Sequence, residues 1–184
     1  MRVIAGSRRS IRLINVKGEQ VRPTTDRIKE TLFNILQPYL AGCSFLDLFS
    51  GSGAIGIEAL SRGAKEAVLV ERDREALACI RTNLKATHFE DTAVLKQGDV
   101  LAVLRTMRHA PFDIIFMDPP YRSGIEAQVL SALNASSLVD EHTIVIIEAS
   151  ADTDAGFAEE LGFSVYREKK YGSNKHIFLE KGKA

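Results

Sequence analysis

The segment FLDLFSGSGAIG, residues 45–56, decides the fold of this 184-residue chain. Its first five residues, 45–49, are apolar apart from Asp47 and predict a short buried strand. Glycine and serine then end the strand at residues 50–53, and residues 54–61 predict a helix. Small residues let the backbone approach a ligand, and a helix N-terminus favours polar or anionic groups. The segment therefore indicates a nucleoside-binding turn of an α/β fold.

The same alternation of strand and helix continues along the chain. Four further strands are predicted by apolar runs at residues 67–71, 93–97, 112–118 and 143–148. Helices are predicted at residues 74–86, with Asp73 as N-cap, 100–107 and 125–135. Residues 163–169 and 175–179 flank a turn cluster at 171–174 and predict a terminal antiparallel hairpin. Five strand–helix units that end in a hairpin do not match the six-strand dinucleotide-binding pattern.

The first forty residues stand apart from this alternation. Residues 2–5 and 10–16 predict two short strands around a turn, and residues 25–37 predict a helix. Because no linker follows, we expect residues 1–40 to be an extension packed on the same domain as residues 41–184.

Composition excludes several classes of protein. With 45% hydrophobic and 26% charged residues, the chain suits one globular domain. Cys43 and Cys79 are too few for a disulfide framework and are expected to be reduced and buried, as in the cytoplasm. Apolar runs are too short to span a membrane, and the four histidines have no metal-ligand spacing. We expect a soluble cytoplasmic protein that binds neither membrane nor metal.

The glycine turn alone leaves the cofactor open. Residues 51–56 read G-x-G-x-x-G, and Glu71 ends the next strand where a ribose-binding acid is expected, so NAD fits the pattern. Asp47 lies inside the strand, where a dinucleotide site normally has an apolar residue. Its carboxylate can receive the ammonium group of an amino-acid-bearing cofactor. This residue therefore favours such a cofactor over NAD.

A second motif, Asp118-Pro119-Pro120-Tyr121, follows the strand at 112–118. Two prolines fix the backbone beside a carboxylate and an aromatic ring, which makes a rigid slot for a planar amine. Asp118 and the Pro119 carbonyl can accept the two amine hydrogens while Tyr121 stacks on the base. Such a base must first leave its stack.

These motifs carry a family resemblance. Residues 47–53 resemble motif I of the Rossmann-like S-adenosylmethionine-dependent methyltransferases, and residues 118–121 resemble their [D/N/S]-P-P-[Y/F] motif for planar nitrogen. Together with residues 22–34 and Tyr171-Gly172, nearly the whole chain resembles the bacterial 16S rRNA (guanine-N2)-methyltransferase family. That family implies a mostly parallel seven-stranded α/β sheet and S-adenosylmethionine as cofactor. It implies catalytic roles for Asp118, Pro119, Pro120 and Tyr121, and cofactor contacts for Thr25, Asp47, Phe49, Gly51, Gly53, Glu71, Arg72, Asp99 and Val100.

Charge distribution points to a nucleic-acid partner. The formal net charge is zero, yet residues 1–40 carry +5, residues 41–164 carry −9 and residues 165–184 carry +4. The basic ends suit phosphate contacts, although a solvated helix face explains part of the pattern. We expect a monomer that binds ribosomal RNA within a partly assembled small subunit. The expected RNA contacts are Arg8, Arg9, Arg22, Arg27 and Lys29.

Three other functions stay open from the sequence. The chain could methylate another planar amine, such as adenine N6 or a protein glutamine, but it has no insertion for reading DNA and has Asp118 where glutamine enzymes favour Asn. It could be a non-catalytic RNA-binding assembly module, although both motifs are intact. It could also be an NAD-dependent oxidoreductase.

Overall fold

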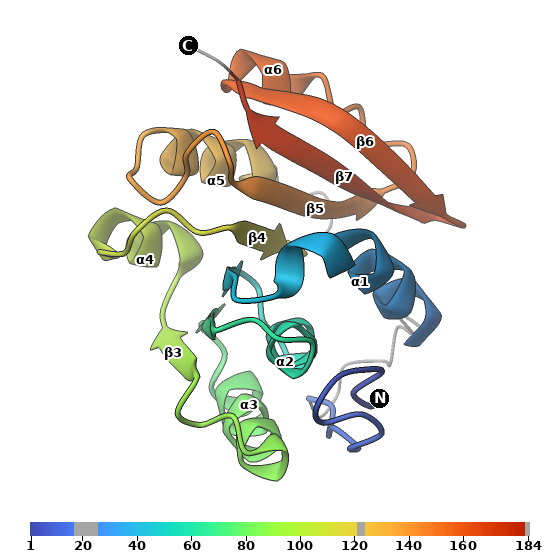
Figure 1. Cartoon of the computed structure of the whole chain (residues 1–184). Helices are drawn as coiled ribbons and strands as arrows, with labels where there is room; N and C mark the ends of the chain where they lie inside the picture. The colour runs from blue at the N-terminus through green and yellow to red at the C-terminus, as the bar shows by residue number, and fades with distance from the viewer. Residues whose placement is uncertain (17–25, 121–123, 183–184) are drawn as a thin grey trace. The chain divides into compact units, whose positions relative to one another are not determined.

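The computed structural model describes residues 1–16, 26–120 and 124–182 (Figure 1). The chain divides into two compact units, Met1–Gly98 and Asp99–Ala184. The predicted boundary at residue 40 is a different division and stays a prediction.

Three parallel strands and their helices build the first unit. Its elements are α1 (Asp26–Leu40), β1 (Ser44–Asp47), α2 (Ala54–Ser61), β2 (Glu66–Glu71), α3 (Arg74–Thr87) and β3 (Ala93–Gln97). The strand order is β3-β2-β1, with Asp47 opposite Leu69 in the pairing of β1 with β2. All four residues of β1 are buried, as expected of a parallel strand covered on both faces.

Helix α2 lies very close to β2 because of one glycine. A Cβ atom at Gly56 would lie 2.7 Å from Leu69 Cδ2, so a larger residue would push the helix from the strand. Helix α3 begins at the predicted cap: Asp73 accepts a hydrogen bond of 2.9 Å from the backbone N–H of Ala76. Cys43 and Cys79 are buried, as predicted, and Cys79 Sγ donates to the Ile14 carbonyl at 3.3 Å.

The two predicted N-terminal strands are wrong. Residues 2–5 and 10–16 make one isolated antiparallel bridge, Arg2 with Arg12, and a turn lies between them. The reason is that other groups take the backbone donors: Ile4 N–H and Ala5 N–H donate to the Glu58 carboxylate. Predicted helix 25–37 is observed as α1, whose described residues extend to Leu40.

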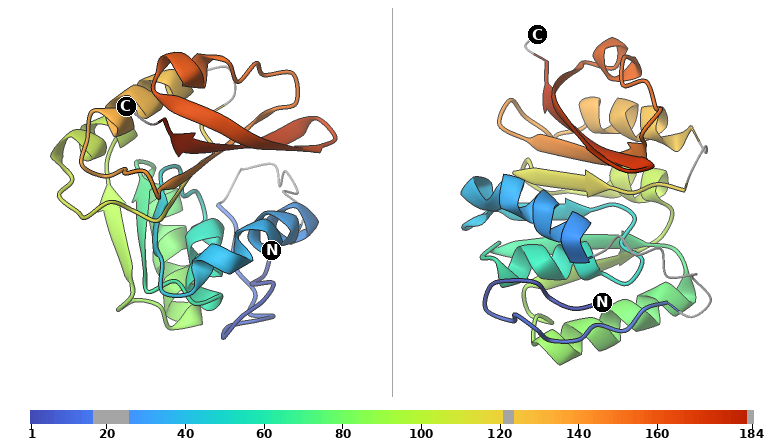
Figure 2. Two further views of the ribbon diagram at one scale, coloured as in Figure 1. Left: turned by 45° about the horizontal axis from the view of Figure 1, so that its top comes forward. Right: turned by 90° about the vertical axis from the view of Figure 1, so that its right-hand side faces the viewer.

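The second unit holds the other four strands. Its elements are α4 (Val100–Thr106), β4 (Ile114–Met117), α5 (Ile125–Asn134), β5 (Ile144–Ser150), α6 (Phe157–Glu160), β6 (Phe163–Tyr171) and β7 (Asn174–Lys181). Strands β4 and β5 are parallel, β7 runs antiparallel to β5, and β6 pairs with β7 as the predicted hairpin. Figure 2 shows this hairpin as two long twisted ribbons with α6 beside β6. The short helix α6 was not predicted.

The predicted fold class is confirmed. The protein has a seven-stranded, mostly parallel α/β sheet with antiparallel strands at the C-terminal end. Among the described residues, no helix is long and apolar enough to cross a membrane.

Candidate active site

Asp47 is the last residue of β1 and precedes the glycine turn at residues 50–53. Its side chain is 1% exposed, and its Oδ2 accepts one bond of 3.3 Å from the backbone N–H of Gly56. Its Oδ1 has no hydrogen-bond partner among the described residues. The pKa of Asp47 is raised to about 7, chiefly by burial and in part by the nearby Glu71 carboxylate, although the hydrogen bond from Gly56 opposes the rise. The turn thus holds a buried carboxylate whose acceptor capacity is incompletely used.

Glu71 ties the end of β2 to the glycine turn. Its Oε2 accepts a bond of 2.9 Å from Gly51 N–H, and its Oε1 accepts bonds from the N–H groups of Arg72 and Asp73. Gly53 N–H donates to the Ser50 carbonyl at 2.6 Å. Gly51 and Gly53 both have positive φ, which favours glycine, so the sequence forms the tight turn that the motif predicts. Asp47, Gly51 and Glu71 are therefore brought together in the first unit.

The remaining predicted cofactor residues have mixed surroundings. Phe49 is half-buried beside the turn, and the Arg72 side chain is exposed. Asp99 begins the second unit as the N-cap of α4, where its Oδ1 accepts bonds of 3.0 and 3.2 Å from Leu101 and Ala102. Val100 is buried in the first turn of that helix. Thr25 lies outside the described residues.

The amine-slot motif follows β4 in the second unit. Asp118 and Pro120 are exposed, whereas Pro119 is buried. Pro119 has no backbone N–H, and the strand ends at Met117 just before the motif. Tyr121 lies outside the described residues. The structure therefore supports a carboxylate next to a backbone fixed by proline.

Basic residues predicted to contact RNA differ in their surroundings. Arg9 and Arg27 are exposed. Arg8 is partly engaged: its Nε donates to the Thr87 carbonyl at 2.7 Å, and its guanidinium lies 5.4 Å from the Phe89 ring centroid. Arg22 lies outside the described residues.

Lys29 differs from its predicted role. The residue is 3% exposed, and its Nζ donates to the Arg2 carbonyl at 2.6 Å and lies 3.4 Å from Glu58 Oε2. Burial lowers the pKa of Lys29, an effect that Glu58 opposes. Lys29 lies on the apolar face of α1 with Leu32, Phe33 and Leu36, which is why it points into the protein. A side chain in this position is unsuited to phosphate contacts.

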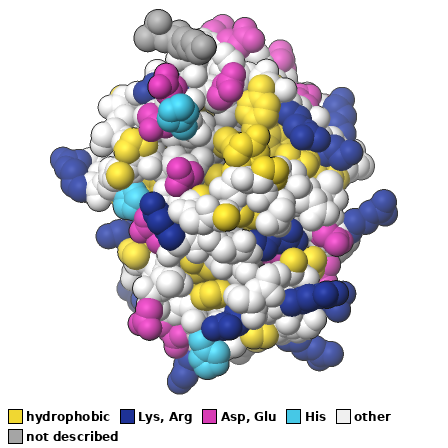
Figure 3. Space-filling model, viewed as in Figure 1, with side chains coloured by type: hydrophobic (Ala, Val, Ile, Leu, Met, Phe, Trp, Pro, Cys, Tyr) yellow, Lys and Arg dark blue, Asp and Glu magenta, His cyan; other side chains and the backbone are white. Residues whose placement is uncertain are grey.

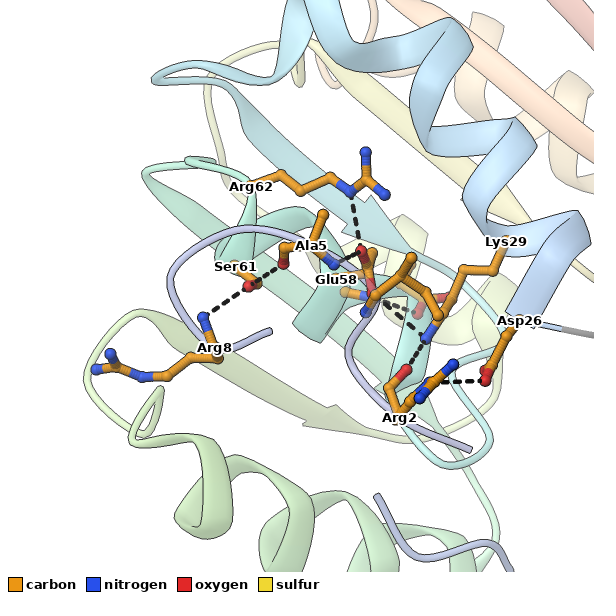
Figure 4. A network of polar contacts seen from close by, with 11 residues as sticks. Arg2, Ala5, Arg8, Asp26, Lys29, Glu58, Ser61 and Arg62 are labelled. Atoms are coloured by element: carbon orange, nitrogen blue, oxygen red, sulfur yellow. Dashed lines mark hydrogen bonds and ion pairs between the residues drawn. The ribbon is translucent and has the colours of Figure 1, made fainter. Parts of the chain in front are cut away.

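Glu58 is a buried carboxylate that the sequence reasoning missed. Figure 4 shows Lys29 from α1 and Arg62, the residue that follows α2, reaching it from different sides, with the N-terminal segment beside it. Glu58 is fully buried and accepts bonds from Ile4 N–H (2.8 Å), Ala5 N–H (3.1 Å) and Arg62 Nε (2.8 Å). The signal was a single acid in the apolar helix AIGIEALS with a basic residue four positions later. Glu58 fastens the N-terminal segment to the helix that follows the glycine turn.

Asn83 on α3 makes a second such connection. Its Oδ1 accepts a bond from Ile14 N–H at 2.8 Å, and its Nδ2 donates to the carbonyls of Ile14 and Ser52. The N-terminal segment and the glycine turn therefore share one buried side chain.

Comparison with known proteins extends over nearly the whole chain. The family model described as Conserved hypothetical protein 95 matches residues 1–180. Ribosomal RNA small subunit methyltransferase D from Escherichia coli K12 is 34% identical over 172 residues, 94% of this chain and 85% of that protein. The protein of the same name from Haemophilus influenzae is 34% identical over 154 residues, 83% of this chain and 80% of that protein.

Solved structures agree with these matches. The E. coli protein yhhF, a candidate methyltransferase, has a TM-score of 0.84 at 33% identity and covers 100% of this chain and 99% of its own. A precorrin-6y methyltransferase from Geobacter metallireducens shares the fold alone, with a TM-score of 0.69 at 17% identity over 93% of this chain and 94% of its own. The resemblance inferred from the motifs is confirmed, and the protein belongs to the Conserved hypothetical protein 95 family.

Proposed function

We propose that this protein transfers a methyl group from S-adenosylmethionine to the exocyclic N2 amine of a guanine in small-subunit (16S) ribosomal RNA. The observation that carries the proposal is the buried Asp47 Oδ1, which none of the described residues hydrogen-bonds, next to a glycine turn that Glu71 holds in place. The named activity of relatives that are 34% identical supports ribosomal RNA as the substrate.

The carboxylates suit a cationic, amino-acid-bearing cofactor. An ammonium group supplies the donor that Asp47 Oδ1 lacks, either directly or through water. Glu71 is proposed to accept from the ribose hydroxyls and Asp99 from the adenine amine, since an ionised carboxylate has about four acceptor sites. The bound cofactor supplies an electrophilic methyl group on a sulfonium centre.

Asp118 and Pro119 are proposed to bind and orient the guanine N2 amine. The N2 lone pair is delocalised into the ring, so the amine is a poor nucleophile. Hydrogen bonds from its two hydrogens to the Asp118 carboxylate and the Pro119 carbonyl orient the lone pair and stabilise the positive charge that develops on nitrogen. Asp118 then accepts the proton that N2 loses, and Tyr121 is proposed to stack on the base.

RNA binding is proposed for the basic ends of the chain. Arg8, Arg9, Arg22 and Arg27 are the proposed phosphate contacts in the N-terminal extension, without Lys29. In the hairpin, exposed Arg167, Lys169 and Lys170 accompany Tyr166, which is 47% exposed. Figure 3 shows hydrophobic side chains with lysine and arginine beside them over the region where Figure 1 draws β6 and β7. Cations beside an exposed ring suit an RNA strand.

The proposed substrate form is the partly assembled small subunit, methylated in the cytoplasm by a monomer. The basic residues of the N-terminal segment and of the hairpin suit the surface of a folded RNA. Sedimentation of the protein with and without the particle would measure both its own mass and its binding.

The decisive experiment is tritiated methyl transfer to small subunits from a strain that lacks this gene, followed by nucleoside mapping. We expect label in N2-methylguanosine. The Asp118→Ala variant should lose on the order of 100-fold or more in rate while it still binds S-adenosylhomocysteine. Glu141→Gln, an exposed change before β5, is the control and should leave the rate unchanged.

The alternatives predict other outcomes of the same experiment. Label in N6-methyladenosine or in protein would overturn the substrate assignment. Tight NADH binding would favour the oxidoreductase. RNA binding without methyl transfer would favour the non-catalytic module.

A further inference from the structure

A cavity of about 530 Å³ lies beside Pro119 within the second unit. Its apolar wall includes Pro119, Ala127 of α5, Ala149 of β5 and Phe157 of α6. Its acidic residues are Glu126, Glu148 and Asp152, and none of the described residues that line it is a lysine, arginine or histidine. A cavity of this composition disfavours phosphate and suits a ligand that combines an apolar ring with N–H donors.

Glu148 is a buried acid of this cavity that two side chains hold in place. It is 5% exposed, its Oε1 accepts a bond from Asn174 Nδ2, and its Oε2 accepts one from His176 Nε2, both at 3.2 Å. His176 is itself 1% exposed and meets the rings of Phe116, Tyr171 and Phe178 edge-on, at centroid distances of 6.1, 5.0 and 6.4 Å. The carboxylate is thus fixed in the cavity wall by two residues of β7.

The two bonds leave Glu148 with acceptor capacity. Each carboxylate oxygen has two lone pairs, so each can accept one bond beyond that from Asn174 or His176. Glu148 is one of the residues that line the cavity. A fixed carboxylate there favours a ligand that places an N–H donor against it over one that places a lone pair at the same position.

Guanine meets this requirement and adenine does not. Guanine presents N1–H next to the N2 amine, whereas N1 of adenine is an acceptor whose lone pair would face the carboxylate. If N1–H points to Glu148, the adjacent N2 amine remains for Asp118 and the carbonyl of Pro119, and Pro119 is itself one of the residues that line the cavity.

We propose that Glu148 reads the N1–H of the target guanine, with His176 and Asn174 as its positioning residues. The inference rests on the proposed methyltransferase function and adds the residue that makes it specific for guanine.

The test replaces the mapped guanine of the small-subunit RNA by 2-aminopurine. This base keeps the N2 amine but carries a lone pair in place of N1–H. The wild-type protein should methylate guanine on the order of 100-fold faster than 2-aminopurine, because a site built to accept from N–H rejects an analogue without it.

In Glu148→Gln the side-chain amide can accept from the N1–H of guanine and can also donate to the N1 lone pair of 2-aminopurine. We expect this variant to slow on guanine by at least about tenfold and its preference over 2-aminopurine to fall below about tenfold. Glu180→Gln, an exposed change on β7, is the matched control and should keep the full preference. Thermal unfolding and S-adenosylhomocysteine titration of each variant identify a folding defect, which would lower both rates without changing their ratio.

Each result has a distinct meaning. If wild type forms N2-methylguanosine and Glu148→Gln keeps the full preference, the role of Glu148 is wrong and the proposed function stands. If Glu126→Gln or Asp152→Asn loses the preference instead, another acid of the cavity reads the base. If wild type forms no N2-methylguanosine, the proposed function itself fails.

Discussion

Two buried carboxylates of the first unit, Asp47 and Glu58, differ in how completely their charge is matched. Glu58 receives two backbone N–H groups and the side chains of Arg62 and Lys29. Asp47 receives one long bond from Gly56 and keeps an oxygen without a partner among the described residues. A matched buried charge stabilises a fold, whereas an incompletely matched one costs free energy and is expected where a ligand completes it.

The largest expected effect comes from removing the matched carboxylate. Glu58→Ala leaves Lys29 and Arg62 without their buried partner and should lower the free energy of unfolding by about 3–5 kcal/mol. Urea denaturation followed by circular dichroism measures it. A loss below about 1 kcal/mol would show that the network does not hold the fold together.

Removing the unmatched carboxylate should affect binding instead. Asp47→Asn should weaken S-adenosylmethionine binding by about 10- to 100-fold, the loss of one hydrogen bond to a charged group, and leave the free energy of unfolding unchanged or higher. Isothermal titration and urea denaturation of the same preparation measure both. A variant that unfolds easily and binds normally would reverse the comparison between the two acids.

The raised pKa of Asp47, about 7, predicts two opposite pH dependences. Between about pH 4 and 7, the Asp47 carboxyl is protonated in the folded protein but ionised in the unfolded chain. The contribution of this group to the free energy of unfolding therefore falls as pH rises through that range. Asp47→Asn should therefore gain stability relative to wild type over that range and keep a constant difference above it. Denaturation at pH 5, 6 and 7.5 measures the difference, and a constant value throughout would contradict the prediction.

Cofactor binding should show the opposite trend, because an ammonium group binds the ionised form of Asp47. We expect the affinity of the wild type to rise as pH increases from 6 to 7.5, with proton release on binding below pH 7. Titration in buffers of different ionisation enthalpy detects that proton. Its persistence in Asp47→Asn would assign it to another group.

The smallest effect is expected from the exposed arginines. Arg9→Ala with Arg27→Ala should weaken RNA binding a few-fold and lower the slope of log affinity against log salt by about 2, one per lost phosphate contact. Lys29→Met should instead lower stability, because Lys29 contacts Glu58. Filter binding at several salt concentrations separates these effects, and an unchanged slope in the double variant would remove both arginines from the interface.

The sequence predicts the turn at Asp47, Gly51 and Glu71 because all three belong to one strand–helix–strand unit, in which the acid ends the second strand beside the turn after the first. The contacts of Ile4 and Lys29 are set by Glu58, which is 54 residues from Ile4 in the chain. Without Glu58 in view, the local pattern predicts a hairpin at Ile4 and a phosphate contact for Lys29. Glu148 and His176 are 28 residues apart and meet only through the register of β5 with β7. Periodicity and motifs therefore do not predict the contacts that depend on tertiary packing.

The attachment of Ile4 and Ala5 to Glu58 has a consequence for anyone who trims or exchanges the start of this chain. Deleting the first six residues takes two donors from a buried anion, so such a truncation acts as a core mutation and should yield aggregated protein on expression. A chimaera that exchanges the N-terminal segment between family members should likewise carry α2 with it.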